Sequence, residues 1–190
     1  MGCYFSKDHK INLENGIFNG IFKVLPEGKI LINGRYNYKN RDEYYGNFIN
    51  NQYEGKGQIT TKKFVYNGDF EKNLIHGKGI LYTNDYSYKG EFFKSKMNGI
   101  GSLKTNNYEY VGEFSNNYIQ GYGKLFYKNL IIYEGCWYKN KALNGNYFLG
   151  DKYYSINFTN KLKIHKNEIL QNIQNFKINI INYDYSKPIL

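Results

Sequence analysis

Cysteine, proline, tryptophan and alanine are scarce in this 190-residue sequence, and the shortages of cysteine and alanine argue against two classes of protein. Two cysteines cannot form the disulfide framework of a small secreted domain, so we expect an intracellular, reducing environment. No apolar run approaches the roughly 18–20 residues that a membrane-spanning helix needs, and nothing resembles a secretory signal. Because alanine and leucine are few, helices are not expected to dominate the fold.

Aromatic residues, glycine and positive charge are abundant instead. The chain contains 22 tyrosines, 13 phenylalanines and 20 glycines, and its formal net charge is +10. Tyrosine, phenylalanine and isoleucine favour strands, while glycine and asparagine suit tight turns, which predicts an all-β protein with many short strands. The charge favours anionic partners such as membrane lipid, nucleic acid or acidic proteins, without choosing among them. The heavy use of Asn, Lys, Ile and Tyr is typical of an AT-rich genome, such as that of a protist.

Two short phrases repeat along the chain with a period of 22 or 23 residues. The first is an aromatic phrase that occurs five times: Tyr44-x-Gly46-x-Phe48, Tyr66-x-Gly68-x-Phe70, Tyr88-x-Gly90-x-Phe92, Tyr110-x-Gly112-x-Phe114 and Tyr133-x-Gly135-x-Trp137. The second is a glycine phrase that follows four of them: Gly55-x-Gly57, Gly77-x-Gly79, Gly99-x-Gly101 and Gly121-x-Gly123. In the fifth copy, Gly145 is interpreted as the first glycine, with Tyr147 replacing the second.

The spacing of these phrases predicts one β-hairpin per repeat. The named residues of the aromatic phrase lie at alternate positions and therefore share one face of a strand. A turn of six or seven polar residues, which includes residues 72–76, is expected to follow, and the glycine phrase is expected to begin the returning strand. A short Asn/Asp turn leads to the next copy. Because one hairpin is marginal in water, stability must come from neighbouring hairpins.

The two phrases closely resemble the MORN (membrane occupation and recognition nexus) repeat. The resemblance covers residues 44–158, with a degenerate N-terminal repeat or cap at 11–43 that includes Phe18-x-Gly20-x-Phe22 and continues from Gly28. A worn copy, Tyr154-x-Ile156-x-Phe158, ends the array. The resemblance implies an elongated single-layer antiparallel sheet of consecutive hairpins. It also implies a membrane or cell-cortex location, in a protist the cortical membrane skeleton, and protein binding or dimerisation.

The segment 159–190 differs in character from the repeats. Ile169, Ile173, Phe176 and Ile180 recur at helical spacing, which predicts a short C-terminal helix that caps the last hairpin. A membrane-surface or partner-binding helix, supported by Lys161, Lys163 and Lys166, is the alternative. Residues 176–180 also alternate in polarity, so a closing strand remains a third interpretation.

The first ten residues are interpreted as an acylated flexible tail. Removal of Met1 would expose Gly2, and Ser6 satisfies the myristoylation pattern. A single myristoyl chain binds membranes only marginally, so stable anchoring needs a second signal. Palmitoylation of Cys3 and attraction of nearby lysines to an anionic leaflet would supply it. The chain is therefore expected at the cytoplasmic face of a membrane, such as the plasma membrane.

Three surfaces of the array are candidates for binding. The aromatic ladder of a one-layer sheet is expected to stay partly exposed and to bind a partner helix or a second copy of the chain, through Tyr66, Phe70, Tyr88, Phe92, Tyr110, Phe114, Tyr133 and Trp137. Lysines near the turns are expected to form a basic edge that holds anionic lipid or simply stays solvated: Lys72, Lys94, Lys96, Lys139 and Lys141. The third candidate is a cross-strand charge ladder on the opposite face, formed by Asn47, Asp69, Glu91 and Glu113 with Lys56 and Lys78.

Nothing in the sequence indicates an enzyme, a metal or a cofactor. The histidines, His9, His76 and His165, have no carboxylate or cysteine at metal-ligand spacing. Cys136 replaces a carboxylate of the other copies and is interpreted as a plain thiol. The leading hypothesis is a membrane-tethered scaffold that binds a protein partner through its aromatic face. The alternative is a phosphoinositide- or anionic-lipid-binding module that acts through the basic edge, and nucleic-acid binding is the weakest interpretation.

Overall fold

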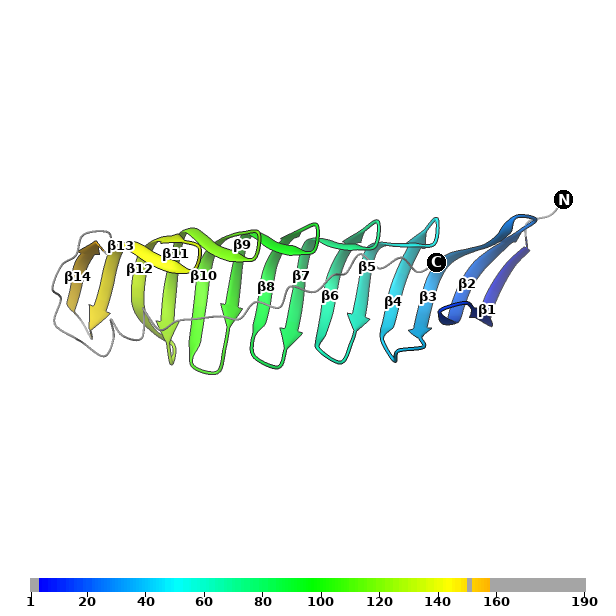
Figure 1. Cartoon of the computed structure of the whole chain (residues 1–190), viewed down its shortest axis with the longest axis horizontal. Helices are drawn as coiled ribbons and strands as arrows, with labels where there is room; N and C mark the ends of the chain where they lie inside the picture. The colour runs from blue at the N-terminus through cyan, green and yellow to red at the C-terminus, as the bar shows by residue number, and fades with distance from the viewer. Residues whose placement is uncertain (1–3, 150–151, 158–190) are drawn as a thin grey trace. The chain divides into compact units, whose positions relative to one another are not determined.

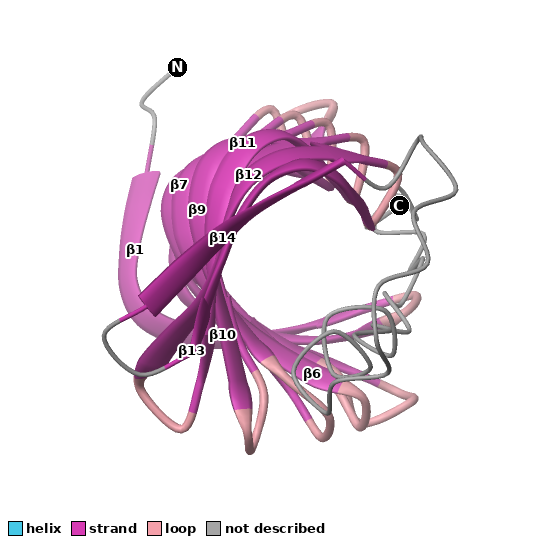
Figure 2. Ribbon diagram, turned by 90° about the vertical axis from the view of Figure 1, so that its left-hand side faces the viewer, coloured by secondary structure: helices cyan, strands magenta, loops and turns pink. Residues whose placement is uncertain are grey.

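The computed structural model describes residues 4–149 and 152–157. This part of the chain forms one open antiparallel sheet of 14 strands, and the order of the strands in the sheet follows their order in the sequence. Figure 2 shows strands and loops only among the described residues. The prediction of an all-β antiparallel fold is confirmed, whereas the predicted C-terminal helix at 159–190 lies outside the described residues and gains no support.

The described chain divides into two compact units. Unit 1 holds residues 4–84 and 92–95, and unit 2 holds residues 85–91, 96–149 and 152–157. The strands of unit 1 are β1 (Tyr4–Leu13), β2 (Gly16–Leu25), β3 (Gly28–Tyr38), β4 (Glu43–Ile49), β5 (Gln52–Thr60), β6 (Phe64–Glu71) and β7 (Leu74–Thr83). The strands of unit 2 are β9 (Lys96–Lys104), β10 (Tyr108–Ser115), β11 (Tyr118–Tyr127), β12 (Leu130–Tyr138), β13 (Lys141–Leu149) and β14 (Lys152–Asn157). Residues of β8 (Ser87–Phe93) belong to both units, and within each unit consecutive strands pair as hairpins (Figure 1).

Each strand presents alternate residues to the two faces of the sheet. We call the side that carries Tyr44, Phe48 and their equivalents the aromatic face, and the other side, which carries Tyr45 and Asn47, the polar face. Glycines meet across the strands in the middle of each hairpin, as in the pairs Gly46–Gly57, Gly68–Gly79 and Gly112–Gly123. These paired glycines leave space on the aromatic face, and a tyrosine ring of the same hairpin fills it.

Edge-to-face aromatic contacts join each hairpin to the next within a unit. The Tyr44 ring meets Phe48 of its own strand at 5.1 Å and Phe70 of the next repeat at 5.2 Å between ring centroids. The Tyr110 ring meets Phe114 at 5.3 Å and Trp137 of the next repeat at 5.4 Å. Edge-to-face geometry is the favoured arrangement of aromatic pairs, and each such pair adds about 0.5–1.5 kcal/mol beyond the area it buries.

The hairpin turns that follow the aromatic phrases contain two residues, and the predicted turns of six or seven residues are wrong. Both turn residues have positive φ, for example 49° at Lys72 and 68° at Asn73. This is the type I′ geometry, whose twist matches that of the flanking strands. The residues after the turn already belong to the returning strand, because Leu74 begins β7 and Ile75 is fully buried.

The second turn residue also binds the neighbouring hairpin. The Asn73 side-chain oxygen accepts a hydrogen bond from the Tyr53 amide at 2.7 Å, and the Asn73 amide donates to the Tyr53 carbonyl at 3.1 Å. The same two bonds join Asn117 to Met97 and Asn140 to Ile119, while Ser95 bonds Ile75 through its hydroxyl and amide. We call this two-bond arrangement the turn clasp. It fixes each turn beside the hairpin that precedes it.

The two glycines of the glycine phrase have different structural roles. The first adopts positive φ, at 65° in Gly55, 59° in Gly77 and 82° in Gly121, and forms a bulge in the returning strand. A carboxylate after the aromatic phrase braces that bulge, because Asp69 accepts a hydrogen bond from the Lys78 amide at 3.0 Å and Glu113 accepts one from the Tyr122 amide at 2.8 Å. The second glycine is the one that lies under the tyrosine ring.

The end copies depart from the sequence interpretation in three ways. Gly145 pairs with Gly135 and is therefore the second glycine, so the prediction that Tyr147 replaces this glycine is wrong, and Tyr147 pairs with Tyr133. In the N-terminal copy, the glycine opposite Gly20 is Gly34 rather than Gly28. Residues 4–13, which include most of the segment interpreted as a tail, form β1, paired with β2.

Candidate functional surfaces

The aromatic face is a packed core rather than an exposed groove. All eight residues predicted to bind a partner there are buried, with exposed fractions of 5% or less. The tyrosine hydroxyl groups among them also have hydrogen-bond partners. Those of Tyr66, Tyr88 and Tyr110 donate at 3.0–3.2 Å to the backbone carbonyl three residues later. The expectation that these rings stay partly exposed is wrong. Paired glycines and edge-to-face contacts allow a single sheet to bury them without a second sheet.

Burial changes the acid–base behaviour of these tyrosines. Desolvation is the largest cause that raises the pKa of Tyr44, Tyr88, Tyr110 and Tyr133 well above the ordinary tyrosine value. The phenols therefore stay neutral across the physiological range. They contribute packing and hydrogen bonds to backbone carbonyls, and they offer no reactive group.

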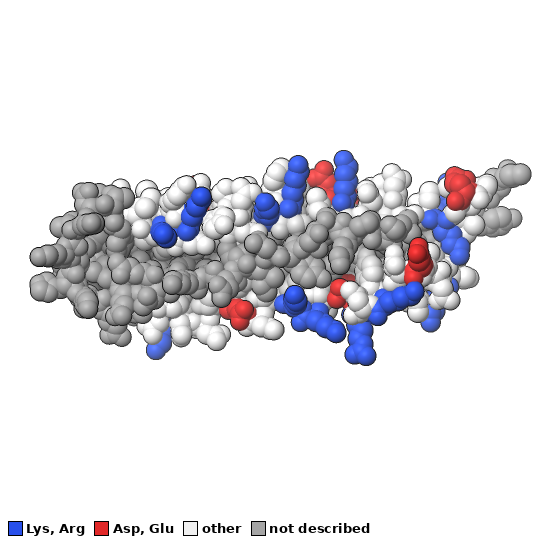
Figure 3. Space-filling view, viewed as in Figure 1, with Lys and Arg blue, Asp and Glu red and all other residues white. Residues whose placement is uncertain are grey.

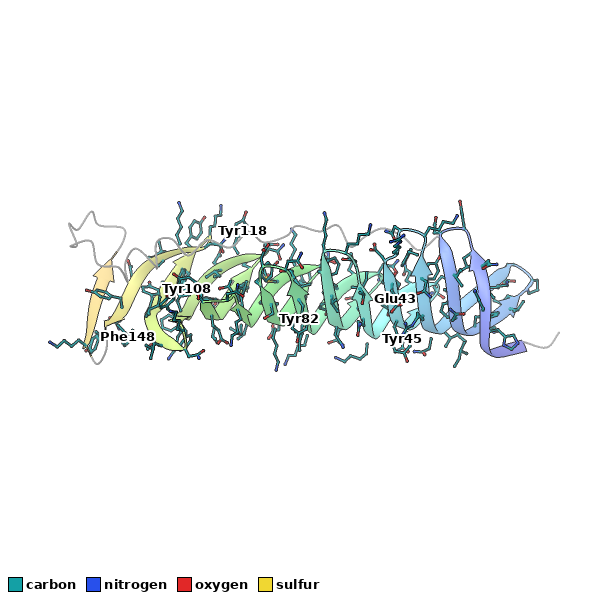
Figure 4. All side chains as sticks on the ribbon, turned by 90° about the horizontal axis from the view of Figure 1, so that it is seen from below. Glu43, Tyr45, Tyr82, Tyr108, Tyr118 and Phe148 are labelled. Atoms are coloured by element: carbon teal, nitrogen blue, oxygen red, sulfur yellow. The ribbon has the colours of Figure 1, made fainter. Side chains whose placement is uncertain are left out.

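The polar face of unit 1 carries the predicted charge ladder together with exposed rings. Lys56 pairs with Asp69 at 2.6 Å, and Arg35 pairs with Glu43 at 3.1 Å. Burial of the Asp69 carboxyl opposes its ionisation, but hydrogen bonds from Lys56 and the Lys78 amide lower its pKa overall. The exposed rings include Tyr45, beside Arg35 on the neighbouring strand, and Tyr82 on β7 (Figure 4).

The polar face of unit 2 repeats this arrangement. Lys124 pairs with Glu134 at 3.1 Å, and Lys104 pairs with Glu109 at 3.9 Å. The Tyr122 hydroxyl also donates to Glu134 at 3.0 Å, which raises the Tyr122 pKa. The Cys136 thiol is free and exposed on this face, as the sequence predicted for its position.

The turn edge, defined as the row of type I′ turns after the aromatic phrases, differs between the units. Figure 3 shows lysine and arginine side chains along the margins of the molecule, where the turns lie. In unit 1, Lys72 lies among carboxylates, because its amide donates to Glu54 at 3.0 Å and the adjacent Glu71 pairs with His76 at 3.3 Å. The Lys94 ammonium lies 5.3 Å from the centroid of the exposed Phe93 ring. This part of the edge has mixed charge.

In unit 2 the turn edge is basic and aromatic. Lys96, Lys139 and Lys141 are exposed, and none forms an ion pair with a described residue. The two turns and the residues beside them, 96–98, 114–119 and 137–142, contain no carboxylate. Tyr118 and Tyr138 are 46% and 51% exposed at the same tips. The structure thus brings three of the five predicted lysines together with two tyrosines that the sequence analysis did not select.

The sequence did contain a signal for the turn clasp. Asparagine recurs at the second turn position in four of the five repeats with an aromatic phrase, at Asn51, Asn73, Asn117 and Asn140. Asparagine tolerates positive φ better than other non-glycine residues, and its short side chain can reach a neighbouring amide. The bulge glycine and its bracing carboxylate were likewise visible as a fixed spacing. Their roles required the hydrogen-bond geometry.

Several predicted features cannot be located on the described chain. The acylation candidates Gly2 and Cys3 lie outside the described residues, directly before β1. In the described residues, no group of three or more His, Cys, Asp or Glu side chains could hold a metal ion. No helix of the described part has the length and apolar character needed to span a membrane.

Comparison with protein families identifies the repeated unit. The family model of the MORN repeat matches four consecutive segments, residues 44–62, 66–87, 88–108 and 110–129. The resemblance found in the sequence is therefore confirmed for four copies, and the fifth lies outside the matched segments. MORN repeats are generally associated with membranes and protein-binding scaffolds, and they form a scaffold family rather than an enzyme family. No curated protein was found that matches this chain.

Proposed function

We propose that the protein is a non-enzymatic scaffold held at the cytoplasmic face of a membrane by lipid on Gly2 and Cys3, with the polar face of its sheet available to a protein partner. The general association of MORN repeats with membranes and scaffolding supports this proposal. The observation that carries it is the burial of every ring of the aromatic ladder, which leaves the exposed Tyr45 and Tyr82 on the opposite face.

The anchor would hold the sheet close to the bilayer. Tyr4, the first residue of β1, follows Cys3 directly, so the two acylation candidates are joined to the sheet by a very short tether. Two residues span at most about 7 Å. Two acyl chains would supply the stable attachment that one myristoyl chain does not.

The anchor is tested by expressing the full chain beside a Gly2→Ala variant in cells supplied with a clickable myristate analogue. We expect the wild type to be labelled and to sediment with membranes, and the variant to be unlabelled and to stay in the supernatant. A Gly2→Ala variant that remains fully membrane-bound would refute lipid as the anchor. Cys3→Ser tests the second signal and is expected to give labelled protein with weak membrane attachment.

The partner surface is tested by proximity labelling at the membrane with matched tyrosine variants. Tyr45→Ser/Tyr82→Ser removes two exposed rings from the polar face of unit 1, and Tyr122→Ser/Tyr153→Ser removes two from unit 2. We expect one pair to lose a set of labelled neighbours that the other pair keeps. Identical neighbours for both variants and for the wild type would exclude these rings as the contact.

A second candidate function is binding of anionic lipid, including phosphoinositide, by the repeats through the turn edge. It is favoured by the exposed lysines of this edge, which project from rigid clasped turns. Unacylated full-length protein should then bind phosphoinositide-containing vesicles, less strongly as salt increases. Lys72→Glu/Lys94→Glu/Lys139→Glu should abolish that binding, and undiminished binding by this variant would refute the role of the edge.

A further inference from the structure

The turn edge of unit 2 differs chemically from the corresponding edge of unit 1. Three lysines without ion-pair partners lie there with two half-exposed tyrosines and no carboxylate, whereas the unit 1 turn at Lys72 has the Glu54 carboxylate on its backbone amide and Glu71 next in sequence. Tyrosine and lysine together are typical of groups that lie at a membrane–water interface.

The clasps place these residues in one row. The Asn117 side chain accepts from the Met97 amide at 2.7 Å, which sets the turn at 116–117 beside Lys96. The Asn140 side chain accepts from the Ile119 amide at 2.7 Å, which sets the turn at 139–140 beside Tyr118. Successive clasped turns are two strands apart, or about 10 Å. The order along the edge is therefore Lys96, Tyr118, Lys139 and Lys141, with Tyr118 between the lysines.

Tyr118 and Tyr138 lie beside the clasped turns with their hydroxyl groups exposed. Neither hydroxyl has a hydrogen-bond partner among the described residues, in contrast to Tyr122, which is held by Glu134. The Lys139 ammonium lies over the Tyr138 ring, 5.4 Å from its centroid, so this ring and this charge are presented together at the turn. A ring below a lysine at a turn tip can enter the headgroup layer while the ammonium remains with the phosphates.

We propose that this edge, formed by Lys96, Tyr118, Tyr138, Lys139 and Lys141, docks on an anionic lipid bilayer, with the two tyrosine rings inserted among the headgroups. The inference rests on the second function proposed above and narrows it to unit 2. It adds insertion of the two tyrosine rings to the attraction between the lysines and anionic lipid. A bilayer fits better than a nucleic acid, because the exposed rings lie at separate turn tips and one of them is partly covered by a lysine.

Vesicle binding by the full-length Gly2→Ala chain tests the charge requirement. The probes are vesicles of phosphatidylcholine alone and of phosphatidylcholine with phosphatidylserine. We expect Lys96→Gln/Lys139→Gln/Lys141→Gln to lower partitioning onto the anionic vesicles by on the order of 100-fold, since three lysines near the surface are lost. The matched control Lys104→Gln/Lys124→Gln/Lys128→Gln loses the same charge elsewhere in unit 2 and should bind much as the parent does. Equal loss in both variants would overturn the proposal.

Fluorescence tests the insertion separately. The background variant is Trp137→Phe, which removes the single tryptophan and restores the residue type found in the other copies. In this background, Tyr118→Trp should shift its emission to the blue on anionic vesicles and be quenched by brominated lipid. Tyr122→Trp, on the polar face, should do neither.

The outcomes separate the inference from the function on which it rests. If the lysine variant loses binding but tryptophan at 118 stays in water, anionic-lipid binding stands and insertion is wrong. If the parent chain binds neither kind of vesicle, both are wrong. Binding of a single-stranded oligonucleotide that is lost in the edge variant, without vesicle binding, would overturn the proposal in favour of nucleic acid.

Discussion

At the scale of the residue, the glycine phrase combines two requirements that are physically independent. Gly55 needs a left-handed conformation, with φ of 65°, and a β-carbon added there would meet nothing closer than the Asn47 amide nitrogen at 3.6 Å. Gly57 has no such conformation, but an added β-carbon would lie 2.5 Å from the Tyr44 hydroxyl oxygen and 2.8 Å from its ring. One glycine is required by backbone geometry and the other by the tyrosine ring.

Alanine substitutions at the two positions should therefore destabilise the protein by different amounts and for different reasons. Gly55→Ala should lower the free energy of unfolding by about 1 kcal/mol, the cost of a left-handed alanine. Gly57→Ala should lower it by about 3 kcal/mol, because the Tyr44 ring must move out of a packed core. Urea denaturation of the two variants measures both values.

A Tyr44→Leu background provides the control for this pair. Removing the ring should reduce the effect of Gly57→Ala by at least half, as expected for two residues in contact, and leave that of Gly55→Ala unchanged. Equal behaviour of the two glycines in both backgrounds would mean that the ring contact does not explain the second glycine.

The buried tyrosines predict how stability depends on pH. Burial raises the pKa of Tyr44, Tyr88, Tyr110 and Tyr133 in the folded state, whereas the unfolded state should titrate near 10. Above that pH the unfolded chain loses protons that the folded chain keeps, so the free energy of unfolding falls as pH rises. The stabilising contribution of the neutral phenols is complete below about pH 9 and is lost progressively above pH 10.

Absorbance at 295 nm and urea midpoints measured across this range check the prediction. The buried set should ionise only as the protein unfolds. Tyr110→Phe should make the fall of the unfolding free energy with pH less steep, by the amount that corresponds to one fewer proton released on unfolding. A single tyrosine transition near pH 10 with constant stability would contradict the assignment.

At the scale of the element, the type I′ turn and its clasp determine which residues reach the edge. In the turn at 116–117, the Asn116 side chain contacts Ser115 at the surface, while the Asn117 side chain accepts the Met97 amide. Both residues have positive φ, 50° and 70°, so glycine fits either position without strain. The two positions differ chiefly in the clasp.

Glycine substitutions within this one turn should isolate the contribution of the clasp. Asn117→Gly should lower the free energy of unfolding by about 1–2 kcal/mol, because the part-buried Met97 amide loses its acceptor. Asn116→Gly should change it by less than about 0.5 kcal/mol. Hydrogen exchange should show faster exchange of the Met97 amide in the first variant alone. Similar stabilities and exchange rates in both variants would exclude a structural role for the clasp.

The strands could be predicted from the sequence wherever each residue type in the repeated phrase had a single structural role. Tyr-x-Gly-x-Phe predicted strands with aromatic residues on one face, because alternation in a strand leaves no other arrangement. The turn length was wrong because residues 72–76 were taken as polar throughout, although Leu74 and Ile75 already alternate toward the core. A two-residue turn needs positive φ at both positions, and lysine at the first of them does not indicate that.

The candidate surfaces were harder to predict because they depend on which side chains the core buries and which it leaves exposed. A one-layer sheet was expected to leave its rings exposed, but opposed glycines let Tyr66 lie against the backbone while Phe70 and Phe92 close over its edges. Lys139 and Lys141, which the sequence placed near a turn, are exposed at the turn edge. Its uneven charge depended on the contact of Glu54 with the turn at Lys72, which sequence spacing does not reveal.

At the scale of the whole molecule, the repeats of unit 1 are interchangeable in their contacts. Phe48 and Phe70 occupy equivalent positions, and Phe18 meets Phe48 edge-to-face at 5.5 Å much as Tyr44 meets Phe70 at 5.2 Å. The Leu31 amide donates to Asn51 at 2.7 Å as the Tyr53 amide donates to Asn73 at 2.7 Å. If one complete repeat were deleted, the residues before it would therefore make equivalent contacts with the next repeat.

Deletion of residues 44–65 should accordingly leave a folded protein. Tyr66 would take the place of Tyr44 opposite Tyr36, Gly68 would pair with Gly34, and Asn73 would clasp Leu31. Because stability in a repeat array is a sum over repeats and their nearest neighbours, we expect a cooperative transition lowered by less than about 10 °C. Deleting residues 44–54 instead removes one strand, reverses the direction of every later strand relative to β3, and should abolish cooperative unfolding. Circular dichroism melts of the two deletions decide the matter, because equal damage by both would mean that the repeats are held by contacts specific to each copy.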